Sequence, residues 1–198
     1  MYGCSALPTG QQTYNGETFN IANGPSGNAW FSSVAAGNGG GVTSVTIQTN
    51  VTNATSVKTL MNTFWGQSLT SYDTITFTGS KGTSAPISLT GNNTLRDYNN
   101  WVWTNGIIQP TVQAWTDTSQ RLDEQSFSLG DYSGETLTSI TITDSGNNLF
   151  SRAFLAALTV DTDPTANAGT TTPEPSYLAF VGASLLGVGL LFRRKRTQ

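Results

Sequence analysis

Short runs with two-residue alternation constrain this chain more than any other feature of its sequence. Val42–Thr49 places Val45 and Ile47 on one side and Thr46 and Gln48 on the other. The runs Tyr72–Thr78 and Thr136–Thr143 alternate in the same way. Because successive side chains of a strand point to opposite faces of a sheet, this pattern predicts half-buried antiparallel strands.

Further strand candidates are separated by turn clusters rich in Gly, Asn and Asp, and they are Thr18–Ala22, Ala29–Val34, Ala85–Thr90, Trp101–Thr104, Thr111–Asp117, Asp123–Leu129 and Phe154–Val160. Only Ser56–Phe64, with Val57, Leu60 and Met61 on one side, is compatible with a short helix. Many short strands with frequent turns predict an all-β fold, a two-sheet antiparallel sandwich with a jelly-roll-like arrangement.

The composition excludes several kinds of chemistry. The chain has no His and a single Cys, Cys4, which removes Ser-His-Asp and Cys-His catalysis, His-metal sites and an internal disulfide. Residues 1–172 carry five basic and eleven acidic side chains. We expect no nucleic-acid partner, because phosphate binding needs a basic face on the folded part.

The C-terminal 38 residues are organised differently from the rest. Residues 161–176 contain three prolines among small polar residues and predict an extended linker. Tyr177–Phe192 is a run of sixteen residues without a charge, and Arg193, Arg194, Lys195 and Arg196 follow it. As a helix the run would span about 24 Å, short of the roughly 30 Å hydrocarbon core of a bilayer.

The flanks of this run favour a membrane anchor over a buried soluble helix. The aromatic residues Tyr177 and Phe192 stand at its two ends, and the basic cluster fits the cytoplasmic side of a stop-transfer anchor. The long basic side chains can extend to the lipid headgroups and compensate for part of the missing length. We therefore predict one C-terminal transmembrane helix.

The order of Pro173-Glu174-Pro175, an apolar span and a terminal Arg/Lys cluster resembles the PEP-CTERM sorting signal of bacterial proteins. The resemblance covers about residues 172–197. It implies recognition and processing by an exosortase, a membrane-embedded transpeptidase-like enzyme, and a destination at the cell surface or in an extracellular matrix, often with exopolysaccharide. The two prolines would keep the backbone extended outside the membrane, as a protease-like enzyme requires.

The expected organisation follows from these segments: an N-terminal segment 1–12, an extracellular β-sandwich 13–160, a linker 161–176, a transmembrane helix 177–192 and a basic cytoplasmic tail 193–198. Met1–Gly10 has neither a basic region nor an apolar region of a signal peptide. Since the other features favour export, we expect a fragment or a start assigned too far downstream.

Binding of polysaccharide or a matrix component is the expected role of the β-domain. Tyr98, Trp101 and Trp103 lie close together among amide side chains, a combination suited to sugar rings, although such aromatic residues also serve as core. A purely structural or adhesive surface protein is the alternative.

A secreted glycosidase is less favoured, because Asp123 and Glu124 are strand neighbours and point to opposite faces unless a bulge intervenes. We assign no catalytic residue and no metal-ligand set. The loops Asp144–Asn147 and Asp161–Asp163 offer oxygen ligands for calcium. Asx-turns are the simpler explanation for the Asp and Asn residues in these loops.

Overall fold

The computed structural model describes residues 7–23, 29–32, 42–64, 71–100, 106–130, 134–145 and 152–163. Within these ranges the chain is all-β with antiparallel sheets and contains no α-helix, as the alternation predicted. None of the described residues form a helix with the length and apolar character that a membrane crossing requires. The expected sorting motif, anchor and basic tail, and the expected strand Trp101–Thr104, lie outside the described residues.

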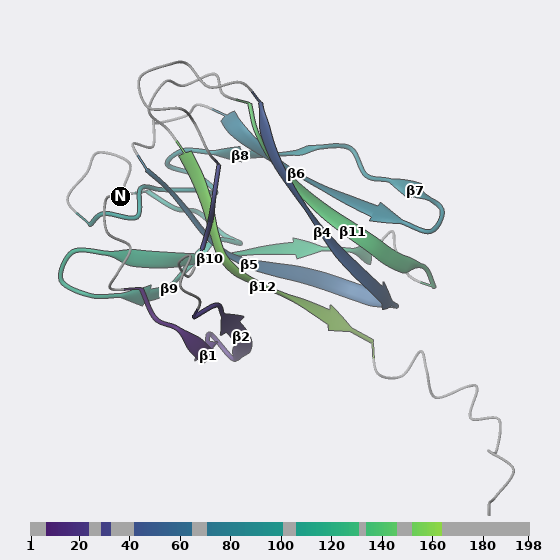
Figure 1. The fold of residues 1–198 in the computed structure, drawn as a ribbon, viewed down its shortest axis with the longest axis horizontal. Coiled ribbons are helices and arrows are strands. Elements are labelled where there is room, and N and C mark those ends of the chain that lie inside the picture. The colour runs from purple at the N-terminus through teal and green to yellow at the C-terminus, as the bar shows by residue number, and fades with distance from the viewer. Residues whose placement is uncertain are drawn as a thin grey trace, which may run out of the picture. The chain divides into compact units, whose positions relative to one another are not determined.

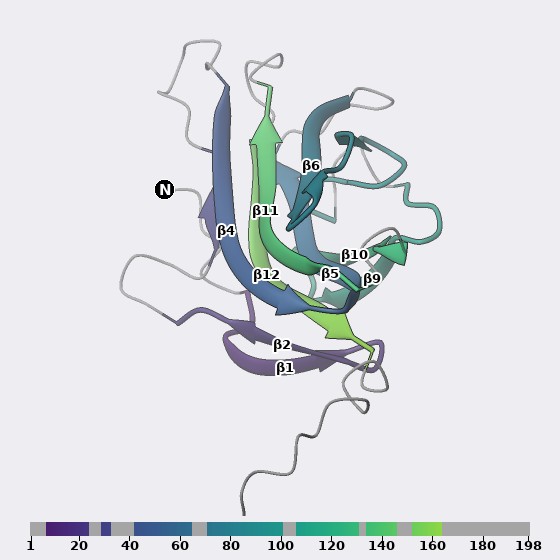
Figure 2. The same cartoon turned by 90° about the vertical axis from the view of Figure 1, so that its right-hand side faces the viewer.

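Two five-stranded sheets and one hairpin make up the described fold (Figures 1 and 2). The first sheet has the order β3-β12-β5-β10-β9, with bounds Trp30–Phe31, Arg152–Thr162, Ala54–Phe64, Arg121–Ser128 and Val112–Thr116. The second sheet has the order β4-β11-β6-β7 with β8 also paired to β6, and the bounds are Thr43–Thr52, Thr136–Asp144, Ser71–Gly79, Gly82–Thr83 and Ile87–Thr90. The hairpin consists of β1 (Gly10–Tyr14) and β2 (Glu17–Ile21).

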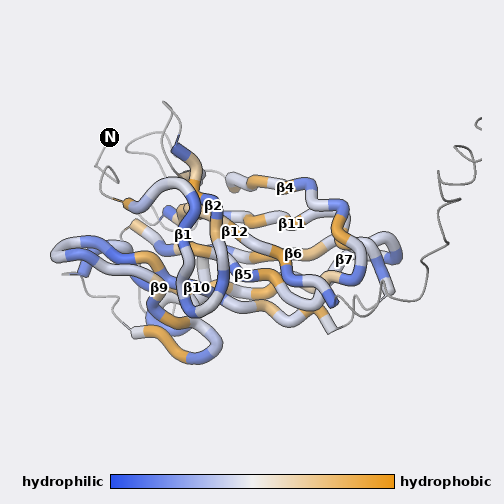
Figure 3. Tube along the Cα trace, turned by 90° about the horizontal axis from the view of Figure 1, so that it is seen from below, coloured by the Kyte–Doolittle hydropathy of each residue, from blue (hydrophilic) through white to orange (hydrophobic). Residues whose placement is uncertain are grey.

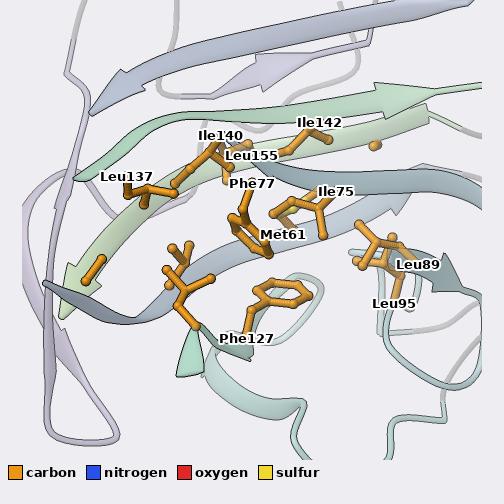
Figure 4. Close-up of a cluster of buried hydrophobic side chains, with 14 residues drawn as sticks. Met61, Ile75, Phe77, Leu89, Leu95, Phe127, Leu137, Ile140, Ile142 and Leu155 are labelled. Atoms are coloured by element: carbon orange, nitrogen blue, oxygen red, sulfur yellow. The ribbon is translucent and has the colours of Figure 1, made fainter. Parts of the chain in front are cut away.

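The inner core lies between the two sheets (Figure 4). Met61 and Phe127 of the first sheet share one buried cluster with Ile75, Phe77 and Ile140 of the second sheet. Residues of one cluster come from facing sheets, so the sheets pack face to face as in a sandwich. Each fully buried side chain of this size contributes about 1.5–3 kcal/mol relative to exposure.

A second core covers the outer face of the first sheet. Phe19 and Ile21 of β2 pack there with Leu60, Leu122 and Phe154. Figure 3 shows the β1–β2 hairpin passing beneath β12, β5 and β10. The inner strands β12, β5 and β10 of the first sheet are therefore largely buried on both faces, whereas alternate residues of β4 are exposed.

Our interpretation of Ser56–Phe64 as a possible helix is wrong, because the segment belongs to β5, the central strand of the first sheet. Val57 and Met61 face the inner core, while Leu60 faces the outer core. A strand buried on both faces loses its polar–apolar alternation, and periodicity alone cannot then distinguish it from a buried helix.

The other expected strands in described regions are present with shifted ends, and two strands of these regions, β1 and β7, were missed. Thr18–Ala22 and Ala29–Val34 correspond to β2 and β3, and the remaining expected strands correspond to β4, β6, β8, β9, β10, β11 and β12. β1 begins at Gly10 and pairs with β2 through Asn15 and Gly16, both with positive φ. An Asn-Gly pair is a strong signal for such a hairpin turn.

A single residue takes the chain from the second sheet into the first. Asn53 stands between β4 and β5 with φ of 56°. Its N–H donates to the Glu135 carbonyl at 2.9 Å, and its own carbonyl accepts from the Asp163 N–H at 3.1 Å. Asn tolerates this left-handed conformation better than other non-glycine residues.

This corner generates a stability prediction. Asn53→Val should lower the free energy of unfolding by about 1–2 kcal/mol, because a β-branched residue is strained at positive φ. Asn53→Gly, which accepts this conformation without strain, should lose less. Urea unfolding followed by tryptophan fluorescence measures both values; equal losses in the two variants would contradict an effect of backbone conformation.

Candidate functional site

Tyr98, the described member of the expected sugar-binding group, belongs to an aromatic cluster. Its ring centroid lies 4.4 Å from that of Phe64 and 6.1 Å from that of Phe154. The side chain is partly buried against the outer core. Trp101 and Trp103 follow in the chain but lie outside the described residues. Packing thus explains one face of Tyr98, and sugar binding by the three residues stays a prediction.

Asp123 and Glu124 have separate partners. The register between β10 and β9 shifts between Leu122 and Asp123, so a bulge lies just before the two acids. The Asp123 carboxylate binds Arg96, whereas the Glu124 carboxylate accepts from Asn15 Nδ2 of the β1–β2 turn at 3.0 Å. The two carboxylates therefore do not converge on one described site.

Asp123 is the centre of a buried polar network. Arg96 donates to both of its carboxylate oxygens, Nε at 2.7 Å and Nη2 at 2.6 Å, and Asn62 Nδ2 donates at 2.7 Å. Arg96 Nη2 also donates to Gln113 Oε1 at 2.8 Å. The network ties the segment around Arg96 to β5, β9 and β10. Sequence reasoning missed Arg96, because its partner comes from a strand 27 residues away.

Arg121 is a second buried guanidinium near this network. It is 4% exposed, and its Nε donates to the Asp97 carbonyl at 2.7 Å. Burial and the neighbouring Arg96 lower the pKa of Arg121 to about 10, although Asp123 and Asp97 act in the opposite direction. Arg121 stays protonated at neutral pH, so both guanidinium groups need acceptors inside the fold.

A pair of acids occupies the inner face of the second sheet at one end of the apolar core. In β6 the buried positions include Asp73, Ile75 and Phe77, and in β11 they include Ile142 and Asp144. Asp73 and Asp144 are direct register partners. In an antiparallel pair, directly opposite Cβ atoms lie about 4.5–5.5 Å apart, so the two carboxylates are close neighbours.

The surroundings of the two acids differ. Asp73 is 0% exposed, and neither of its carboxylate oxygens has a hydrogen-bond partner. Burial and, to a smaller extent, the nearby Asp144 raise the pKa of Asp73 to about 8, although Arg152 acts in the opposite direction. Asp144 is 3% exposed and accepts from Ser32 Oγ at 2.6 Å. The position of Asp73 was visible in the sequence, since it alternates with Ile75 and Phe77.

The calcium candidates of the sequence are only partly described. Asp144 ends β11, and Asn147 lies outside the described residues. Asp161 accepts from Ser56 Oγ and pairs with Lys58. Among the described residues, no three side chains of the His, Cys, Asp and Glu types gather as a metal site. Asp73, Asp144 and Ser32 nevertheless place several oxygen atoms together.

The outer face of the second sheet carries a regular array of hydroxyl groups, which we call the hydroxyl face. Cross-strand contacts join Ser44 to Thr143 at 2.9 Å and Thr46 to Thr141 at 3.0 Å. The register of the three neighbouring strands sets its rows as Ser44–Thr143–Thr74, Thr46–Thr141–Thr76 and Gln48–Ser139–Thr78. Figure 2 shows β4, β11 and β6 side by side. None of these nine side chains is charged.

Comparison with known proteins assigns no family: the chain matches no family model, and no curated protein matches it. Its function is therefore inferred from its own residues.

The buried network generates the second prediction. Arg96→Met should lower the free energy of unfolding by about 3–5 kcal/mol, because it leaves Asp123 buried without its cation. The double variant Arg96→Met/Asp123→Leu should recover much of this loss, since it removes the uncompensated charge. Urea unfolding curves provide the values.

A matched control uses the partly exposed ion pair between Lys58 and Glu17, whose side chains are 19% and 25% exposed. Lys58→Met should cost about 1 kcal/mol or less, because solvent screens such pairs. Comparable losses for Lys58→Met and Arg96→Met would contradict the special role of the buried pair.

Proposed function

We propose that this protein is exported to the bacterial cell surface or extracellular matrix, where its β-domain binds polysaccharide without catalysing a reaction. The observation that carries the proposal is the order of segments at the C-terminus. The last strand of the described residues, β12, ends at Thr162, and Pro173-Glu174-Pro175, the apolar run 177–192 and the basic cluster Arg193–Arg196 follow in the sequence. This order supports an exosortase as the processing partner and a membrane anchor that is cleaved after export.

The order of strands in the sheets supports a jelly-roll arrangement for the β-domain. Successive long strands β4, β5, β6, β10, β11 and β12 alternate between the two sheets. The orders β3-β12-β5-β10 and β4-β11-β6-β8 correspond to the two interleaved sheets of a jelly roll, an architecture that lectin domains use. Because folds of this kind host many functions, the proposal of polysaccharide binding must also identify a surface that can contact the polymer.

The hydroxyl face supports a neutral polysaccharide as the ligand. Neighbouring strands lie about 4.8 Å apart, and alternate residues of one strand about 6.7 Å apart, so its hydroxyl groups repeat at regular spacing. Hydroxyl and amide groups can donate to and accept from sugar hydroxyls. The absence of charge on these nine positions removes the attraction that an anionic polymer would need.

The chemistry of the described acids supports a non-catalytic role. Hydrolysis of a glycosidic bond requires two carboxyl groups flanking one substrate, at separations of about 5–10 Å across an open site. Asp123 is buried in its ion pair with Arg96, and Glu124 is held by Asn15. Asp73 and Asp144 are close together but buried in the sandwich.

Sorting has a direct test. After expression in a bacterium that contains an exosortase, the surface form should lack residues from about Glu174 onward, because processing removes the anchor. Intact-mass spectrometry of the surface fraction measures this. Replacement of Pro173-Glu174-Pro175 by three alanines should leave the full-length chain in the membrane fraction. A mature surface protein that retained Arg196 would contradict the proposal.

Polysaccharide binding is tested by co-sedimentation of the domain with cellulose and curdlan as neutral probes and polygalacturonate as an anionic probe. We expect binding to a neutral probe, and loss of affinity by about tenfold, equivalent to roughly 1.4 kcal/mol, for Thr46→Lys or Thr141→Lys. Thr18→Lys, on the exposed side of the β1–β2 hairpin, is the matched control and should bind normally.

The same assay separates the two candidate surfaces and the alternative role. If Trp101→Ala or Trp103→Ala abolished binding while the Thr46 and Thr141 variants bound normally, the binding surface would be assigned to the aromatic residues instead of the hydroxyl face. No binding to these probes or to a wider glycan array would favour the structural or adhesive role over polysaccharide binding.

A further inference from the structure

The acid pair at the end of the inner core carries a further inference. The positions of Asp73 and Asp144 continue rows that are otherwise apolar, Ile75 and Phe77 in β6 and Ile142 in β11. Leucine or valine at these two positions would extend the inner core. The two acids therefore reduce the burial of apolar surface at this end. A partner with positive charge would stabilise them there.

Among the described residues, Asp73 lacks the compensation that a buried carboxyl group needs. Asp73 and Asp144 contribute two carboxylates, and Arg152, at the start of β12 in the first sheet, is the cation that acts on Asp73. Asp73 itself receives no hydrogen bond at either oxygen. Transfer of an ionised carboxylate out of water is costly unless a proton, an ion pair or a metal ion compensates for it. A cation bound beside Asp73 would supply this compensation in place of a proton.

The chemical type of the available ligand atoms indicates which cation would bind. Both oxygens of Asp73 are free of hydrogen bonds, Asp144 adds its carboxylate, and Ser32 contributes a hydroxyl oxygen that already contacts Asp144. The chain has no His, so imidazole ligands for zinc, copper or nickel are absent. Oxygen ligands of this kind suit a hard divalent ion, and the flexible coordination of Ca²⁺ accommodates an irregular set better than the strict octahedron of Mg²⁺.

We propose that Asp73 and Asp144, together with Ser32 Oγ, bind a calcium ion at this end of the sandwich. With two carboxylates and one hydroxyl from the described residues, the site should be weak, in the range of about 10⁻⁴–10⁻³ M that is typical of extracellular modules. The proposal does not depend on the sorting signal or on polysaccharide binding, and it predicts a structural role for the ion.

The ion would join the two sheets. Asp73 and Asp144 belong to β6 and β11 of the second sheet. Ser32 follows β3 in the first sheet, and its N–H donates to the Ala153 carbonyl of β12 at 3.1 Å. The hydrogen bond from Ser32 to Asp144 already spans the two sheets. A cation bound to the same atoms would strengthen that contact and relieve the repulsion between the two acids.

The test uses the full chain in detergent, dialysed against EDTA and returned to chelator-free buffer at pH 7.5. Addition of CaCl₂ to about ten times Kd should raise Tm by about 3–6 °C, because the ion binds the folded state only. NaCl at matched ionic strength should not reproduce the shift, and MgCl₂ should give a smaller one. Isothermal titration calorimetry with CaCl₂ measures the affinity directly.

Variants identify the ligands. Asp73→Asn and Asp144→Asn should fold, since they remove buried charge, and should lose the calcium-dependent shift; circular dichroism checks the fold. Ser32→Ala should weaken calcium binding several-fold while both carboxylates remain. Asp163→Asn, in the other calcium candidate of the sequence, is the matched control and should keep the shift.

The proposal would be overturned by any of the following results: no calorimetric binding of calcium by the wild type up to 20 mM CaCl₂, an unchanged shift in Asp73→Asn, or an equal shift with NaCl. Loss of the shift in Asp163→Asn alone would assign the ion to the other loop and would also overturn it. If a proton is the only compensating cation, Asp73→Asn should be more stable than the wild type near neutral pH and calcium should have no effect.

Discussion

Burial of the central strand β5 on both faces is the constraint on which the described structure depends. Val57 and Met61 pack between the sheets, while Leu60 packs under the β1–β2 hairpin. On its two edges β5 pairs with β12 and β10 along most of its length. One strand therefore fixes the sheet order, the position of the second sheet and the place of the hairpin. A disturbance there would affect both cores at once.

Polar residues enter this interior in two different ways. Around Asp123 the buried charge is matched by Arg96, and Asn62 and Gln113 complete the hydrogen bonds. Such satisfied networks tie segments together at little net cost. Around Asp73 the buried carboxyl group has no hydrogen-bond partner at either oxygen. This contrast within one fold is the reason why we place the proposed ligand at the second site.

The two sides of the second sheet have different roles. Its inner side supplies Ile75, Phe77 and Ile140 to the core, and its outer side presents the hydroxyl face. Threonine suits both demands, because its β-branched side chain favours strands and its hydroxyl group interacts with water or sugars. The low content of charged residues, 11%, follows from this use of uncharged polar groups. It is also compatible with the proposed binding of a neutral polysaccharide.

The sequence by itself determined the all-β class and the positions of most strands, because the two-residue alternation of segments such as Thr136–Thr143 directly records one buried face and one exposed face. It also contained the signal for the first hairpin, Asn15-Gly16, and the inward position of Asp73. Only the tertiary structure decided that Ser56–Phe64 is a strand, since burial on both faces erases the alternation. It alone decided the pairing of Arg96 with Asp123 and of Asp73 with Asp144, because such contacts join distant segments and local patterns carry no information about them.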